Sequence, residues 1–106
     1  MDISKLYVHD GRVLRVIEDA ERDTVTMEVE LPASPDSDEL VPRLLVFEDA
    51  YSYQVFEGPF QGCPAILGMQ VVGEHGRWRR VRLDTNAGYR ELFCTGVRVL
   101  EHDHVA

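Results

Sequence analysis

Cationic and aromatic side chains alternate over one short stretch of the chain. Arg77, Trp78, Arg79 and Arg80 follow one another, and Arg82 comes two positions later. Arginines interleaved with an aromatic ring can hold nucleic acid through phosphate contacts and base stacking. The net charge of the protein is −8 and no wider basic face surrounds the stretch, so we expect no nucleic-acid partner. We expect pairing with acidic residues of neighbouring strands or, as a binding role, contact with a protein or a small anion.

Two histidine-containing segments could support acid–base or metal chemistry. His9 precedes Asp10, but adjacent side chains can cooperate as a base and its orienting carboxylate only in a turn. We expect Asp10 to cap a turn and His9 to pack at one end of the fold. His102 and His104 would share one face of an extended segment and could bind a divalent metal. Nothing places a third ligand beside them, so we predict no metal site.

The cysteines offer a possible nucleophile. Cys63 precedes Pro64 in a turn-rich segment, and the histidine nearest to it in sequence, His75, falls in a predicted turn, so we expect no catalysis there. Cys63 and Cys94 are the only cysteines, and we expect both to be reduced and buried. The chain contains no phosphate loop, dinucleotide fingerprint, Cys-x-x-Cys pair or G-x-S-x-G motif. We therefore predict a protein without enzymatic activity or cofactor.

Length, hydropathy and charge set further bounds. A chain of 106 residues suits one domain. No segment approaches the roughly 18 consecutive apolar residues of a membrane helix, and the first residues lack the layout of a signal peptide, so we expect a cytoplasmic protein without membrane contact. Residues 1–60 carry 14 acidic and 5 basic residues, whereas residues 61–106 carry 5 acidic and 6 basic ones. The acidic half could attract a basic partner, although acidity also serves solubility alone.

The elements that must position these residues are strands. Residues 24–31 alternate cleanly, with Val25, Met27, Val29 and Leu31 on one face and threonine and glutamate on the other. Residues 12–18 precede this strand across an acidic turn at residues 19–23, which predicts a hairpin. Further strands are expected at residues 44–48, 51–57, 65–73, 77–84 and 89–100, with a bulge at Gly68 and a bend at Gly96.

No window shows sustained helical periodicity, and turn signals recur every 8–12 residues or so. The sequence therefore predicts an all-β antiparallel sandwich or small barrel of about seven to eight strands. Residues 32–42 are expected to form an acidic loop rich in proline and serine, in which a short helix over residues 36–40 is conceivable. Residues 102–106 are expected to form a C-terminal tail.

The opening hairpin carries a resemblance. His9 and Asp10, then Leu14 and Ile17, an acidic turn, and the alternating strand that begins at Thr24 resemble the start of several small bacterial families of uncharacterised all-β domains. Some members of such families occur beside toxin genes and are immunity-like. The resemblance covers residues 9–31, about a quarter of the chain. It implies an all-β fold, and it carries no catalytic residue across.

Two hypotheses of function follow. In the first, the domain binds a protein, either a basic partner or further copies of itself, and the wet face that bears Glu28 and Glu30 is the candidate contact surface. In the second, the domain is a small-ligand-binding barrel or a minor enzyme with a pocket at one open end. Its candidate lining residues are Tyr51, Tyr53, Trp78 and Arg80.

Overall fold

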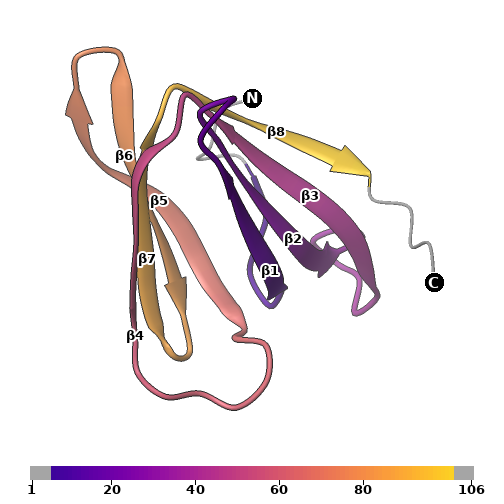
Figure 1. Ribbon diagram of the computed structural model, residues 1–106. Helices are drawn as coiled ribbons and strands as arrows, with labels where there is room; N and C mark the ends of the chain where they lie inside the picture. Colours follow the sequence, from indigo (N-terminus) through magenta and orange to yellow (C-terminus); the bar gives the residue numbers. More distant parts are fainter. Residues whose placement is uncertain (1–5, 102–106) are drawn as a thin grey trace.

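The computed structural model describes residues 6–101, which form two four-stranded antiparallel sheets packed face to face (Figure 1). Sheet A has the order β1 (Arg12–Asp19), β2 (Thr24–Pro32), β3 (Leu40–Glu48) and β8 (Gly96–Glu101). Sheet B has the order β4 (Tyr51–Glu57), β7 (Gly88–Cys94), β6 (Trp78–Thr85) and β5 (Ile66–His75). The predicted all-β class and strand number are confirmed, and the architecture is a sandwich rather than a closed barrel. None of residues 6–101 lies in a helix that could traverse a membrane.

The alternation of β2 places its apolar face in the core. Val25, Met27, Val29 and Leu31 are almost completely buried against sheet B residues, and β2 pairs with β1 on one side and β3 on the other. The polar face of β2 points away from the sandwich, where Glu28 lies opposite Arg15 of β1. One buried and one wet face are the arrangement that the period of two predicts.

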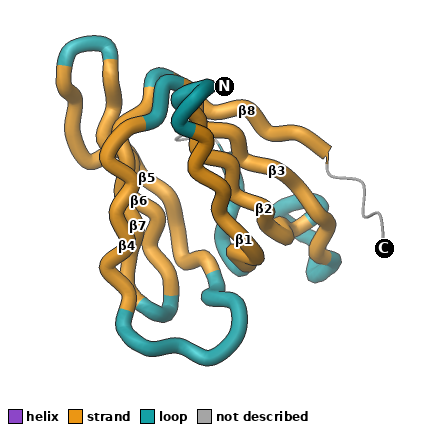
Figure 2. The backbone as a smooth tube through the Cα atoms, viewed as in Figure 1, coloured by secondary structure: helices purple, strands orange, loops and turns teal. Residues whose placement is uncertain are grey.

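The acidic loop is shorter than the sequence predicts. β2 runs to Pro32 and β3 already begins at Leu40, which leaves residues 33–39 as the loop (Figure 2). Proline has no amide N–H to donate to a neighbouring strand. Pro42 fits inside β3 because the described pairing with β8 begins only at the next residue, Arg43. No helix forms between residues 33 and 39. The hydroxyl of Ser37 instead accepts a hydrogen bond from the Glu39 amide at 3.0 Å, which closes a turn.

A single bent ribbon joins the two sheets. β3 continues into β4 through Asp49 and Ala50, and β7 continues into β8 through Thr95. Glu48 faces Gly96 in sheet A and Tyr51 faces Phe93 in sheet B, so the register is unchanged across the corner. The Thr95 amide donates to the Glu48 carbonyl oxygen at 3.0 Å between the two ladders. The break predicted at Gly96 therefore lies one residue earlier, and it separates strands of different sheets.

On the other side of the sandwich, the start of β1 binds the segment that enters β5. The amide of Asp10 donates to the Ile66 carbonyl oxygen, and the amide of Ile66 donates to the Gly11 carbonyl oxygen. A Cβ atom at Gly11 would lie 2.6 Å from the carbonyl oxygen of Glu30, so this position admits no side chain. Glycine is required here because the backbone of residue 11 lies close to that of Glu30. The residue of the turn with a positive φ is Asp10, at 69°.

Away from the corner, a covered ion pair stabilises sheet B. The guanidinium of Arg90 contacts Glu57 through two hydrogen bonds of 2.7 and 2.8 Å, and the two side chains are only 13% and 10% exposed. The Thr85 hydroxyl also donates to Glu57, and Arg90 donates to the Tyr53 hydroxyl. The hydrogen bond from Arg90 lowers the pKa of Glu57, and burial raises the pKa of Tyr53. The network fills one end of the sandwich with satisfied polar groups.

Candidate functional site

The outer face of sheet B gathers aromatic side chains near the corner. Phe93 of β7 lies directly opposite Tyr51 of β4 and Arg80 of β6, and directly opposite residues point to the same face of a sheet. Trp78 shares this face because it lies two residues before Arg80, and His75 of β5 pairs with Trp78. The neighbouring residues Leu92 and Val81 point the other way and are buried. The aromatic face is thus the one turned away from sheet A.

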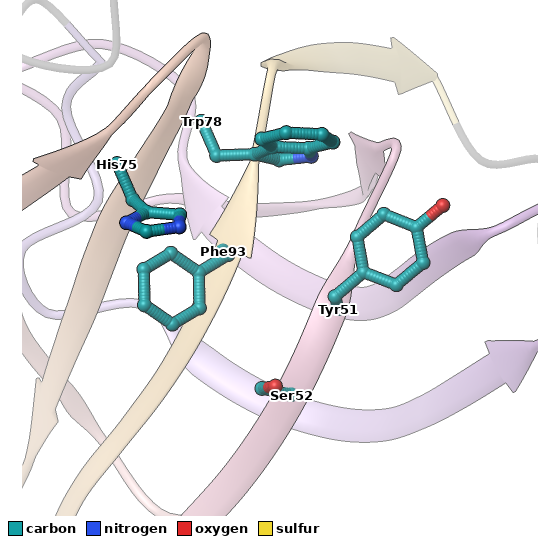
Figure 3. Close-up of a pocket in the computed structure, with 5 residues that line it drawn as sticks. All are labelled: Tyr51, Ser52, His75, Trp78 and Phe93. Atoms are coloured by element: carbon teal, nitrogen blue, oxygen red, sulfur yellow. The ribbon is translucent and has the colours of Figure 1, made fainter.

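These side chains line an open hollow of about 480 Å³ (Figure 3). We call it the aromatic hollow, and its lining residues are Tyr51, Ser52, His75, Trp78 and Phe93. The rings surround a common space, with Tyr51 and Trp78 in edge contact at 6.1 Å between centroids and His75 and Phe93 at 6.3 Å. The walls are largely apolar, so an apolar or flat group would lose water-exposed surface on entering it.

Two turns of sheet A hold the largest rings in place. The Tyr51 hydroxyl donates to the Asp23 carboxylate at 3.1 Å, and the Trp78 Nε1 donates to the Asp49 carbonyl oxygen at 3.1 Å. Asp49 is itself held by Thr95, whose hydroxyl donates to its carboxylate at 2.9 Å. The hydrogen bond to Asp23 raises the pKa of Tyr51. The site therefore depends on the packing of both sheets, because one aspartate comes from the β1–β2 turn and the other from the corner.

A second, acidic hollow adjoins the first. It has a volume of about 220 Å³ and lies between the β1–β2 turn and the start of β4. Glu18, Asp19 and Asp23 line it, and it shares Tyr51 and Ser52 with the aromatic hollow. We call it the acidic hollow. Asp19 also accepts hydrogen bonds from the amides of its own turn. An apolar surface thus continues directly into a negatively charged one.

Two of the four predicted pocket residues line the aromatic hollow. Tyr51 and Trp78 do so, whereas Tyr53 and Arg80 do not. A bulge in β4 sets two residues, Ser52 and Tyr53, against one residue of β7, which turns Tyr53 toward Arg90 and the core. Arg80 lies on the outer face, but its guanidinium contacts Glu91 at 3.7 Å and does not border the hollow. Tyr51 and Tyr53 therefore lie on opposite faces of β4.

Glu28 and Glu30 lie on sheet A, apart from both hollows. The Glu28 side chain is 15% exposed and contacts Arg15 through two hydrogen bonds, one of them 3.0 Å long. Glu30 is half-buried and lies between Arg12 of β1 and Pro42 of β3. The acidic residues beside the aromatic hollow are instead Glu18, Asp19 and Asp23.

The other candidate residues lie away from the hollows. His9 and Asp10 occupy the predicted turn and their side chains approach to 3.1 Å, but both are more than half exposed, so His9 does not pack against the fold. Cys94 is buried, and burial raises the pKa of its thiol to about 11. Cys63 is exposed, contrary to expectation, because it lies in the loop before β5. His102 and His104 lie outside the described residues.

His75, Phe93 and Ser52 were not predicted as site residues. A two-residue turn at Gly76 and Arg77 brings His75 opposite Trp78, whereas the sequence suggested a turn one residue earlier. The glycine, which has a φ of 62°, was the available signal for this turn. Phe93 and Ser52 reach the hollow through the β4–β7 register and its bulge, which no local pattern reveals.

Aromatic rings make up most of the lining of the aromatic hollow. Ser52 and His75 both line it, but no hydrogen bond joins their side chains among the contacts of residues 6–101, so we base no catalytic step on them. Within the same described part of the chain, no group of three or more metal-ligating side chains is close enough to hold an ion. Aromatic walls and adjoining carboxylates favour non-covalent capture of a group that is apolar and cationic.

Comparison with known proteins adds no relative to this description. No family model, no curated protein and no solved structure matches the chain.

Proposed function

We propose that the protein is a binding domain without enzymatic activity that captures a basic segment of a partner protein. An apolar side chain of the partner would enter the aromatic hollow, and lysine or arginine side chains next to it would enter the acidic hollow. The observation that supports the proposal is the junction of the two hollows at Tyr51 and Ser52. A ligand that fills both must carry apolar and cationic groups a few ångströms apart.

The aromatic hollow suits the apolar part of such a segment. Trp and Tyr are the side chains that most often dominate binding energy at protein interfaces, because they offer large, rigid contact areas. Tyr51 and Trp78 are held in place before binding by hydrogen bonds to Asp23 and Asp49. Pre-ordered rings lose little conformational entropy when a partner arrives.

The acidic hollow and the aromatic faces suit the cationic part. The Arg77 guanidinium already lies over the Trp78 ring, 4.8 Å from its centroid, and 4.0 Å from the Asp49 carboxylate. This contact within the chain illustrates the cation–π and carboxylate contacts that a partner cation would make. The net charge of −8 would also accelerate the approach of a basic partner.

An immunity-like protein that neutralises a basic toxin is one form of this proposal, consistent with the resemblance of the opening hairpin. A cytoplasmic location is part of the proposal as well. A reducing compartment suits two cysteines that are both free, one of them exposed.

The proposal can be tested with the intrinsic fluorescence of Trp78, the only tryptophan of the chain. The probe is a short peptide with one phenylalanine between two pairs of lysines. We expect a saturable change in Trp78 emission, because the phenylalanine would enter the hollow that this ring lines. Replacing the phenylalanine by alanine should weaken binding about tenfold. Replacing the lysines by glutamates should abolish it.

Charge reversals locate the contact. Glu18→Lys changes the acidic hollow, and Glu30→Lys makes the same charge change on the polar face of β2, away from both hollows, so the second serves as the matched control. We expect the peptide to bind more weakly to the first variant and as tightly as wild type to the second, measured by calorimetry. Greater weakening by Glu30→Lys would show that the peptide contacts the polar face of β2 and not the acidic hollow. Absence of any binding to the lysine peptide would refute the proposal.

A small aromatic cation is the second candidate ligand. The volume of about 480 Å³ lies within the range of small-molecule sites. Titration with phenethylammonium separates the two candidates. If it binds as tightly as the peptide, the aromatic hollow alone accounts for affinity and the site is a small-ligand pocket.

A further inference from the structure

Charged residues almost vanish from one part of the chain. Residues 50–73 contain a single charged side chain, Glu57, although 28% of all residues are charged. Glu57 is covered and paired with Arg90, so it presents no free charge. This segment forms β4, the loop that passes below sheet B in Figure 2, and most of β5. We call it the uncharged segment.

The uncharged segment also exposes apolar side chains. Of the ten large hydrophobic residues that are exposed among residues 6–101, six belong to it. On and beside β4 these are Tyr51, Val55, Phe56 and Phe60, each between 45% and 49% exposed. β4 is an edge strand, since β7 is its only neighbour in sheet B, and its outer side therefore carries backbone groups that no described strand binds.

Natural proteins usually protect such edges with charges, bulges or covering segments, and the other three edges show these devices. The start of β1 binds the segment around Ile66. β5 is interrupted by two register shifts. β8 carries Arg98 and Glu101 within its six residues. On β4 the bulge affects only the first residues, and the stretch from Gln54 to Glu57 is regular.

We propose that β4 pairs antiparallel with β4 of a second copy of the chain, which joins the two copies of sheet B into one continuous sheet. This inference goes beyond the proposed capture of a basic segment and uses a different part of sheet B. Two-fold symmetry brings the same surface of both copies into contact, so this surface must be complementary to itself. An edge without free charge meets this condition.

The charge distribution favours a second copy over other occupants. Residues 1–49 carry 13 acidic and 5 basic residues, so two copies repel each other through sheet A. Contact through β4 places the uncharged segment between the copies. A nucleic acid or an anionic membrane would require basic side chains, and residues 50–73 contain no lysine, arginine or histidine. The acidic hollow rather than this edge fits a basic partner.

The symmetry specifies the test. In an antiparallel pair across a two-fold axis, one residue of β4 lies opposite its own counterpart, and we place the axis at Val55, one of the two middle residues of the regular stretch. Val55→Lys would then set two ammonium groups side by side, which destabilises the pair. Leu100→Lys is the matched control, because Leu100 is 39% exposed on β8, the edge strand of sheet A.

Light scattering after gel filtration gives the readout. We expect wild type and Leu100→Lys to have the mass of two 12.1 kDa chains, and Val55→Lys to dissociate at least tenfold more readily. Circular dichroism checks that each variant is folded. Should Val55→Lys fail to fold, Val55→Cys in a Cys63→Ser background replaces it, and oxidation should then cross-link two chains through position 55, whereas Leu100→Cys in the same background should not.

Several outcomes would overturn the inference. The inference would be wrong if wild type remained monomeric up to about 1 mM. It would also be wrong if a monomer bound neutral lipid vesicles, because a bilayer would then cover the edge of β4. A dimer unaffected by Val55→Lys would place the contact elsewhere. The peptide experiment is independent of these results, since its hollows lie outside the paired stretch, so either proposal can fail alone.

Discussion

Asp23, Asp49 and Ser52 adopt positive φ angles of 52°, 48° and 55°, and all three border the two hollows or hold their rings. Aspartate tolerates this conformation better than most residues because its short side chain bonds to nearby backbone. The two aspartates accept hydrogen bonds from the site: the Asp23 carboxylate from the Tyr51 hydroxyl and the Asp49 carbonyl oxygen from the Trp78 indole. Two single residues therefore hold the rings that strand register has placed on this face.

The covered ion pair between Glu57 and Arg90 gives a prediction at the residue scale. Glu57→Gln should lower the free energy of unfolding at neutral pH by about 3 kcal/mol, because it leaves Arg90 covered without its counter-charge. Glu48→Gln is the control. Its partner Arg98 lies at 3.4 Å but both side chains are about half exposed, so the loss should stay below about 1 kcal/mol. Urea unfolding measures both values.

The same pair predicts a pH dependence. The folded pKa of Glu57 lies below its unfolded value of about 4.3, so the pair stabilises the fold above that pH. This stabilisation is lost as the pH falls through the lowered folded pKa. The difference in unfolding free energy between wild type and Glu57→Gln should therefore shrink below about pH 4. A constant difference down to about pH 2 would contradict the assignment of the lowered pKa to Glu57.

At the scale of elements, the β1–β2 hairpin contacts sheet B at both of its ends. Its turn supplies Asp23 to the Tyr51 hydroxyl, and its first residues bind the segment around Ile66. Gly11 takes part in this second contact, and its backbone lies so close to the carbonyl oxygen of Glu30 that a side chain would not fit there. A glycine in a predicted turn thus serves close packing, with no positive φ of its own.

Gly11→Ala should therefore destabilise the fold by about 2 kcal/mol, through the clash of the new methyl group with backbone atoms. Gly58→Ala is the matched control, since nothing lies within 4 Å of its Cβ position and its φ is not positive. It should change the unfolding free energy by less than about 0.5 kcal/mol. Thermal or urea unfolding measures the effect of both substitutions. Equal changes in the unfolding free energy would show that the added methyl group at position 11 causes no destabilising clash.

The bulge in β4 shows why an element can be predicted well and its side chains wrongly. The bounds of β4, Tyr51–Glu57, agree with the strand expected at residues 51–57. One extra residue between Tyr51 and Gln54 nevertheless reverses the alternation and separates Tyr51 from Tyr53. A bulge is a property of the pairing between two strands, and Ser52 carries no residue-type signal for it.

At the scale of the whole molecule, the two hollows adjoin each other at Tyr51 and Ser52, and the regular stretch of β4 from Gln54 to Glu57 borders neither of them. The proposed partner segment would meet the acidic hollow, whereas the proposed second copy would meet the uncharged segment. The two associations should therefore respond to salt in opposite directions. Screening weakens attraction between the protein and lysine side chains, and it also weakens repulsion between two copies of net charge −8.

Raising the salt concentration from about 0.05 to 0.5 M should weaken lysine-peptide binding several-fold and tighten the dimer. Calorimetry measures the first effect and sedimentation equilibrium the second. Urea at low concentration is no substitute for salt, because it acts on apolar contacts in both associations. If both associations changed in the same direction, one of them would not use the surface assigned to it.

The sequence by itself determined the fold class and most strand positions. A period of two over residues 24–31, turn residues between strands and the lack of helical periodicity are local features, and local backbone geometry follows from them. It also singled out Tyr51 and Trp78, which both line the aromatic hollow, and it shows the uneven distribution of charge. The buried face of β2 follows directly from its alternation.

The tertiary structure decided which residues meet. Phe93 and His75 join Tyr51 and Trp78 only through strand register, and Asp23 and Asp49 reach them only because the ribbon bends between the sheets. The open edge at β4, which makes the fold a sandwich, is likewise a result of how the sheets pack. Register, bulges and sheet closure depend on contacts between residues far apart in the chain, and no short sequence pattern contains them.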